Sequence, residues 1–182
     1  MRVRTLTGGL AAVLVLAGPL LNGPAEAVPS AGTAPRQVAV DVLTYDASRA
    51  GEFKAAVDRG AAIWNESVES VELRPAGSGE SADVRIVVDD GWPRSVPSSQ
   101  GGGTVYLGRE AMDQGYYAIR VAAHELGHML GLPDRKPGPC SDLMSGASAG
   151  LSCTNPYPSA AEKAQVERNF EGAPAGALLG RS

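Results

Sequence analysis

Short apolar runs and helical stripes of apolar residues follow one another along this chain. Residues Val38–Tyr45 are apolar or β-branched at most positions, which predicts a central strand. An apolar stripe at helical spacing follows at Phe53, Ala56, Val57, Gly60, Ile63 and Trp64. We expect this stripe to form a helix that packs on the sheet, with Asp46 or Ser48 as its N-cap.

The later part of the chain predicts further strands and helices. The strands are expected at Val71–Arg74, Asp83–Val88 and Thr104–Leu107. Gly91–Gln100 predicts a loop because it contains two prolines and three serines. Helical periodicity begins again near Tyr116 and over Ala160–Phe170. The pattern therefore predicts an α+β fold with an N-terminal helix that packs on the sheet.

Residues 1–27 have the features of a secretion signal peptide. Arg2 and Arg4 precede an apolar run at Leu10–Leu21, and Ala25–Ala27 fits a small-x-small cleavage site. A membrane anchor is the alternative, but the run is shorter than the ~20 apolar residues that a spanning helix requires.

The rest of the chain predicts a single domain. Residues 28–36 are rich in Pro, Ala, Gly and Ser, and form either a short pro-segment or a flexible N-terminus. Residues 37–171 have the size of one domain and contain no visible repeat. Residues 172–182 are expected to form a flexible tail.

Composition excludes some partners. The net charge is −4, the pI is about 5.2 and no basic patch stands out, so nucleic acid is not expected as a partner. The chain contains two cysteines, which in an exported protein predicts one disulfide. We expect a secreted, extracellular monomer with no membrane association after signal cleavage.

The candidate metal-binding and catalytic residues lie around the two histidines of the chain, His124 and His128, which are four residues apart. On an α-helix this spacing places both imidazoles on one face, where they can bind Zn²⁺. Glu125 adjoins the first histidine and can take a proton from water on the open side of the metal. The alternative is a helix with two surface histidines and a chance glutamate.

The residues after the second histidine favour the zinc interpretation. Gly131 is a natural helix stop, and Pro133 prevents the helix from resuming. The chain must therefore turn, and Asp134 can swing back toward the histidines as a third ligand. A fourth position is then left for water, as in catalytic zinc sites.

The pattern H-E-x-x-H-x-x-G-x-x-D at residues 124–134 resembles the metzincin signature, with aspartate where histidine is usual. The aspartate and the short cysteine loop after it are similar to those of the snapalysin family, the small secreted neutral proteases of streptomycetes. Cys153–Pro158 and Ala62–Asn65 are also similar to that family. The resemblance spans roughly Val38–Phe170 and implies a metzincin-like domain with a twisted mixed sheet, an active-site helix and a C-terminal helix.

The resemblance also implies roles outside the zinc motif. It implies a disulfide between Cys140 and Cys153, and a Met-turn in which Met144 packs beneath the zinc ligands. It places Thr104–Leu107 at the sheet edge above the cleft, where an extended peptide can bind by strand addition. A plain hairpin with a flexible glycine entry is the alternative for that segment.

The sequence departs from the family pattern in two segments. Members often have Tyr-Asp-Ser-Thr-Arg ahead of the zinc helix, and its Asp and Thr contribute to a calcium site. Tyr116–Arg120 lacks both side-chain oxygens here, so calcium is not carried over. The family commonly has a tyrosine where this chain has Lys136. Either Lys136 or another residue such as Tyr157 replaces that tyrosine, or activity is reduced.

The sequence thus predicts a secreted zinc metalloendopeptidase that acts on proteins or peptides. One Zn²⁺ is expected to be held by His124, His128 and Asp134, with Glu125 as general base. The alternatives are a secreted zinc-binding protein without catalysis and a peptide-binding module. The retention of Glu125 argues against the first alternative, because a structural zinc needs no general base.

Overall fold

The computed structural model describes residues 40–171. The expected signal peptide at 1–27, the stretch at 28–36 and the tail at 172–182 lie outside the described residues and stay predictions. The elements are, in chain order, β1 (Asp41–Arg49), the 3-10 helix η1 (Gly51–Phe53), α1 (Lys54–Asn65), β2 (Val71–Pro75), β3 (Val84–Asp89), β4 (Arg94–Ser99), β5 (Gly102–Gly108), α2 (Arg109–Asp113), α3 (Ala118–Met129), the 3-10 helix η2 (Leu143–Ala149) and α4 (Ala160–Phe170).

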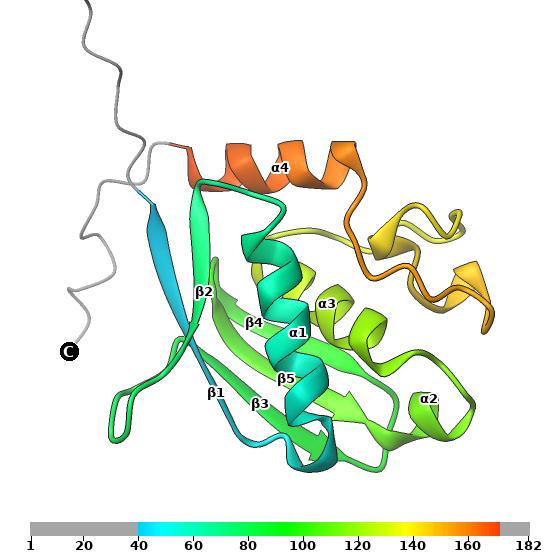
Figure 1. The fold of residues 1–182 in the computed structure, drawn as a ribbon, viewed down its shortest axis with the longest axis horizontal. Helices are drawn as coiled ribbons and strands as arrows, with labels where there is room; N and C mark the ends of the chain where they lie inside the picture. Colours follow the sequence, from blue (N-terminus) through cyan, green and yellow to red (C-terminus); the bar gives the residue numbers. More distant parts are fainter. Residues whose placement is uncertain (1–39, 172–182) are drawn as a thin grey trace, which may run out of the picture. The chain divides into compact units, whose positions relative to one another are not determined.

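Within the described residues, five strands form one mixed sheet in the order β2-β1-β3-β5-β4. Neighbouring strands are parallel except at β4, which runs antiparallel to β5 and forms an edge of the sheet (Figure 1). Buried and exposed residues alternate along β2, as expected for a strand with one face on the core. The predicted α+β fold with a mixed sheet is confirmed.

Helices α1 and α3 pack on each other and on the sheet, α1 against β1 and β2 and α3 against β4 and β5 (Figure 1). The indole of Trp64 fixes their contact, because its Nε1–H donates to the carbonyl oxygen of Ala123 at 2.8 Å. Trp64 is fully buried together with Val57 and Ile63 from the same predicted stripe. The apolar face of α1 therefore positions α3 over the sheet.

The sheet edge differs from the sequence prediction. The expected loop at Gly91–Gln100 contains β4, and the expected edge strand at Thr104–Leu107 is part of β5, between β3 and β4. The prediction of Thr104–Leu107 as the edge is therefore wrong. Pro97 is compatible with a strand because an edge strand needs partners on one side only.

The start of α1 also differs from the prediction. Asp46 and Ser48 lie within β1, and the Asp46 carboxylate accepts a hydrogen bond from the Ser48 N–H at 2.8 Å. Neither residue caps a helix, since α1 begins at Lys54, after η1, without a side-chain cap. The short helix α2 was not predicted.

The C-terminal helix is confirmed over the predicted range. Val166 and Phe170 are buried against the core, and Ser159 and Glu162 form a capping box at its start. No helix among residues 40–171 is both long and apolar enough to cross a membrane.

Candidate active site

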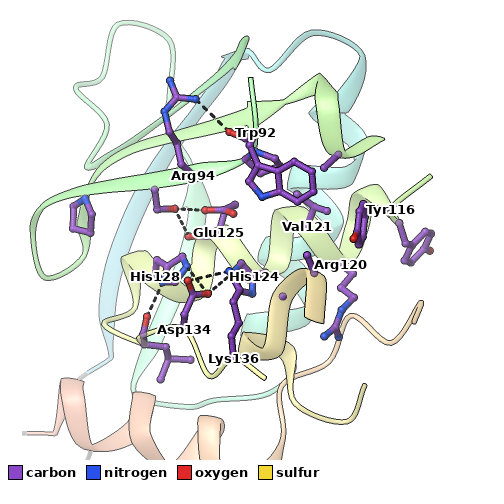
Figure 2. A pocket seen from close by; sticks show the side chains of 18 residues that line it. Trp92, Arg94, Tyr116, Arg120, Val121, His124, Glu125, His128, Asp134 and Lys136 are labelled. Carbon is purple, nitrogen blue, oxygen red and sulfur yellow. Dashed lines mark hydrogen bonds and ion pairs between the residues drawn. The ribbon is translucent and has the colours of Figure 1, made fainter. Parts of the chain in front are cut away.

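Helix α3 presents reactive side chains to a cleft of about 360 Å³. Its His124, Glu125 and His128 line this cavity together with Asp134 and Lys136 from the segment after the helix (Figure 2). Only 6% of His124 and 4% of Glu125 are exposed to solvent. The structure therefore brings together in one cleft the residues that the sequence singled out.

A left-handed turn after α3 carries the chain back to the histidines. Gly131 has a φ of +83°, which disfavours residues with a Cβ, and its N–H donates to the carbonyl oxygen of His128 at 3.0 Å. After this turn, Oδ1 of Asp134 lies 3.2 Å from Nε2 of His124 and 3.6 Å from Nε2 of His128. The predicted turn at Gly131 is confirmed.

The spacing of these donor atoms fits a zinc ion. Nδ1 of His124 lies 3.0 Å from the Leu143 carbonyl oxygen and Nδ1 of His128 lies 2.8 Å from that of Leu132. Because a carbonyl oxygen only accepts, each Nδ1 is the protonated nitrogen and each Nε2 keeps a free lone pair. Tetrahedral zinc ligands with bonds of about 2.0–2.1 Å lie roughly 3.3 Å apart. The observed distances of 3.2 and 3.6 Å to Asp134 Oδ1 are close to that value.

Burial and neighbouring charge shift the pKa values of these groups. Burial lowers the pKa of His124 to about 4, which keeps the imidazole neutral near pH 7. Burial also raises the pKa of Glu125. For Asp134, burial raises the pKa, but the hydrogen bond and charge of Lys136 outweigh it and leave the pKa lowered. The site thus combines a neutral imidazole at His124 with an ionised carboxylate at Asp134.

Two buried charged residues hydrogen-bond to the segment that contains Met144, and neither was predicted. Arg120 is 5% exposed and donates to the Asp142 carbonyl oxygen at 2.8 Å. Glu162 is fully buried and accepts from the backbone N–H groups of Leu143 and Met144 at 3.0 and 2.8 Å. The S-x-x-E spacing at the start of α4 was the available signal for Glu162. We find no comparable sequence signal for Arg120.

Met144 and the cysteines lie in the same supporting segment. Met144 is fully buried, and a Cβ at position 127 would lie 2.8 Å from its Sδ, so Gly127 allows the methionine to pack against α3 between the two histidines. Cys140 and Cys153 are joined by a disulfide, with their Cα atoms 5.5 Å apart. The cross-link closes the loop that contains Met144.

Lys136, and not Tyr157, lies in the cleft. The Lys136 ammonium donates to Oδ2 of Asp134 at 3.1 Å, so the two carboxylate oxygens face different partners. The Tyr157 hydroxyl instead accepts from Arg59 of α1 at 2.7 Å. Tyr157 is absent from the residues that line the cleft, so the suggestion that it replaces the family tyrosine is wrong.

A mixed sheet over a helix that carries H-E-x-x-H, followed by a turn that returns an aspartate, defines a metzincin-like domain. The chain belongs to the Streptomyces extracellular neutral proteinase (M7) family, whose model matches residues 39–172. The resemblance to snapalysins that the sequence indicated is confirmed.

Two relatives named extracellular small neutral protease illustrate the match. The protein from Streptomyces lividans is 42% identical over 135 residues, which cover 74% of this chain and 59% of that protein. The protein from Streptomyces caespitosus is 44% identical over 125 residues, which cover 68% of this chain and 92% of that protein. The chain therefore spans less than two thirds of the Streptomyces lividans protein.

A solved structure shows the same fold at low sequence identity. The archaemetzincin from Methanopyrus kandleri superposes with a TM-score of 0.50 and 14% identity, covering 75% of this chain and 98% of that one. This likeness concerns the fold alone.

Proposed function

We propose that this chain is a secreted zinc metalloendopeptidase that hydrolyses peptide bonds in proteins or peptides. The observation that carries the proposal is the convergence of His124, His128 and Asp134 beside the buried Glu125 in an open cleft. The relatives are named extracellular proteases, which supports both the activity and export. We expect export to use the signal peptide at residues 1–27.

Three side chains would hold one Zn²⁺, His124 and His128 through Nε2 and Asp134 through Oδ1. When bound, zinc supplies Lewis acidity that polarises a carbonyl group and acidifies water. The carboxylate of Asp134 makes this ligand set more negative than one of three imidazoles. We therefore expect the acidification to be weaker than in a three-histidine site.

Glu125 acts first as general base and then as general acid. Its carboxylate takes one proton from the attacking water while the water oxygen bonds to the carbonyl carbon of the substrate. It then gives that proton to the leaving nitrogen as the C–N bond breaks, which regenerates the carboxylate. Burial, which raises the pKa of Glu125, favours this role because a carboxyl group with a pKa nearer 7 exchanges protons more effectively.

Strand β4 supplies the edge along which a substrate would bind. It is an outer strand of the sheet, and its residues Arg94, Ser95 and Pro97 line the cleft. An extended peptide can pair with the outer backbone groups of such a strand. This arrangement would lay the scissile bond across the zinc ligands.

Cleavage of casein by the purified, zinc-loaded protein tests the proposal. We expect fragments with cuts inside the casein chain, identified by mass spectrometry, and no fragments in a matched reaction with a chelator. Added zinc should restore cleavage after the chelator is removed. Casein that is bound but stays intact would contradict the proposal and identify a peptide-binding protein. Zinc binding with neither casein binding nor cleavage would identify a zinc-binding protein without catalysis.

A further inference from the structure

A serine of the edge strand contacts the proposed general base. Ser95 Oγ lies 2.7 Å from Oε2 of Glu125 and 2.9 Å from the carbonyl oxygen of the same residue. Ser95 is half-buried on β4, and Glu125 lies on α3, so the contact joins two elements that line the cleft. Among residues 40–171, no other side chain hydrogen-bonds to the Glu125 carboxylate.

We propose that Ser95 is a positioning residue that acts through Glu125, an inference that rests on the proposed function. The hydroxyl holds Oε2 and fixes the rotation of the carboxylate. Oε1 receives no hydrogen bond from the described residues and is left to accept the proton of water. Because Ser95 belongs to the strand along which a peptide would bind, the same residue sets the distance between substrate and base.

The second contact of the hydroxyl suits a base that changes its proton count during turnover. Ser95 carries one hydroxyl proton but has two acceptor oxygens of Glu125 within 2.9 Å. While Glu125 is a carboxylate, the hydroxyl donates to Oε2, the more negative acceptor. When Glu125 holds the proton from water, the hydroxyl can rotate toward the carbonyl oxygen without movement of heavy atoms. Ser95 keeps its own proton throughout, so the proton balance of the reaction is unchanged.

Kinetics of the zinc-loaded Ser95→Ala and Ser95→Thr variants test the proposal. We expect Ser95→Ala to lower kcat about 10- to 100-fold, the range for a lost hydrogen bond to a charged group, with KM and zinc content unchanged. Ser95→Thr keeps the hydroxyl and should recover most of kcat. Ser78→Ala removes an exposed hydroxyl in the turn after β2 and should match wild type. In a Glu125→Gln background, Ser95→Ala should cause no further loss, because its effect passes through the carboxylate.

The proposal is overturned if Ser95→Ala keeps a kcat within twofold of wild type. Equal losses in the alanine and threonine variants, accompanied by lower melting temperatures, would also overturn it, because they would assign Ser95 to strand packing. In both cases an active wild type leaves the proposed function in place. A zinc-loaded wild type that does not cleave would overturn the proposed function and this inference with it.

Discussion

The two halves of the candidate site are held in place by different means. The α3 half consists of His124, Glu125 and His128. The loop half consists of Asp134, Lys136 and Met144. In the α3 half, the helical repeat sets the direction in which each side chain leaves the backbone. The loop half has little regular structure beyond η2, so its geometry needs support from elsewhere.

That support comes from residues far away in the sequence. Arg120 of α3 and Glu162 of α4 bind the backbone around Met144, and the disulfide between Cys140 and Cys153 closes the loop. We therefore expect substitutions in the α3 half to remove chemistry without unfolding the domain. Substitutions in the supports of the loop half should destabilise the fold.

His128→Ala has the largest expected effect. It should remove the bound zinc without destabilising the fold. Loss of one of three ligands removes roughly a third of the ~10–16 kcal/mol typical of tight zinc sites, so occupancy should fall from about one equivalent to near zero. Among residues 40–171, the one hydrogen bond of the imidazole is to the nearby Leu132 carbonyl oxygen, so the melting temperature of the metal-free protein should change little. Metal analysis after dialysis measures the occupancy. Full zinc retention would show that the ligand assignment is wrong.

Arg120→Met should lower the free energy of unfolding by about 3–5 kcal/mol, because at least two hydrogen bonds from a charged donor are lost at about 1.5–3 kcal/mol each. The substitution leaves the carbonyl oxygens of Asp142 and Asn155 without their charged donor. Urea unfolding gives the value. Arg109→Met is the matched control, because its exposed ion pairs should contribute little. Equal destabilisation by the two substitutions would refute the role given to Arg120.

Replacing both cysteines by serine should cost about 3 kcal/mol on the chain-entropy model, because the cross-link closes a short loop. Cys140 and Cys153 are 13 residues apart and lie outside the ligand set. We therefore expect a lower melting temperature, while zinc stays bound at about 20 °C. Calorimetry and metal analysis of the same sample measure both quantities. An unchanged melting temperature would show that the loop half does not depend on the disulfide.

Lys136→Met has the smallest expected effect. Partners that orient a metal ligand are typically worth 10- to 100-fold in metal affinity, and the half-exposed ammonium should lie at the low end, about tenfold. Competition with a zinc-chelating dye measures the affinity. Lys54→Met, on α1 and outside the cleft, is the charge-matched control. An affinity equal to that of the control would show that Lys136 does not orient Asp134.

The α3 half could be predicted from the sequence because its geometry is local. The four-residue spacing of the histidines needs only a helix to bring them together. Gly131 and Pro133 indicate the turn that brings Asp134 back toward them. The apolar stripe that ends at Trp64 likewise predicted the helix on which α3 packs.

The edge strand and the supports could not be predicted because they depend on tertiary pairing. Strand β4 is mostly exposed, shows no clear alternation and contains Pro97, so only its ladder with β5 makes it a strand. Ser95 was therefore missed as a neighbour of Glu125. Arg120 looked like an ordinary helix residue, since its acceptors lie 20 or more residues away in the sequence.

The most direct test of the central claim is the cleavage rate of Glu125→Gln against wild type at equal zinc content. Glutamine keeps the size and hydrogen-bonding reach of glutamate but cannot take up the proton of water. We predict unchanged zinc content and fold, with a loss of activity of at least 10²–10⁴-fold, the range for general-base catalysis. A chelator blank excludes metal-independent background cleavage, and circular dichroism excludes misfolding. Near-wild-type cleavage by the zinc-loaded variant would contradict the account, because Glu125 would then not be the base.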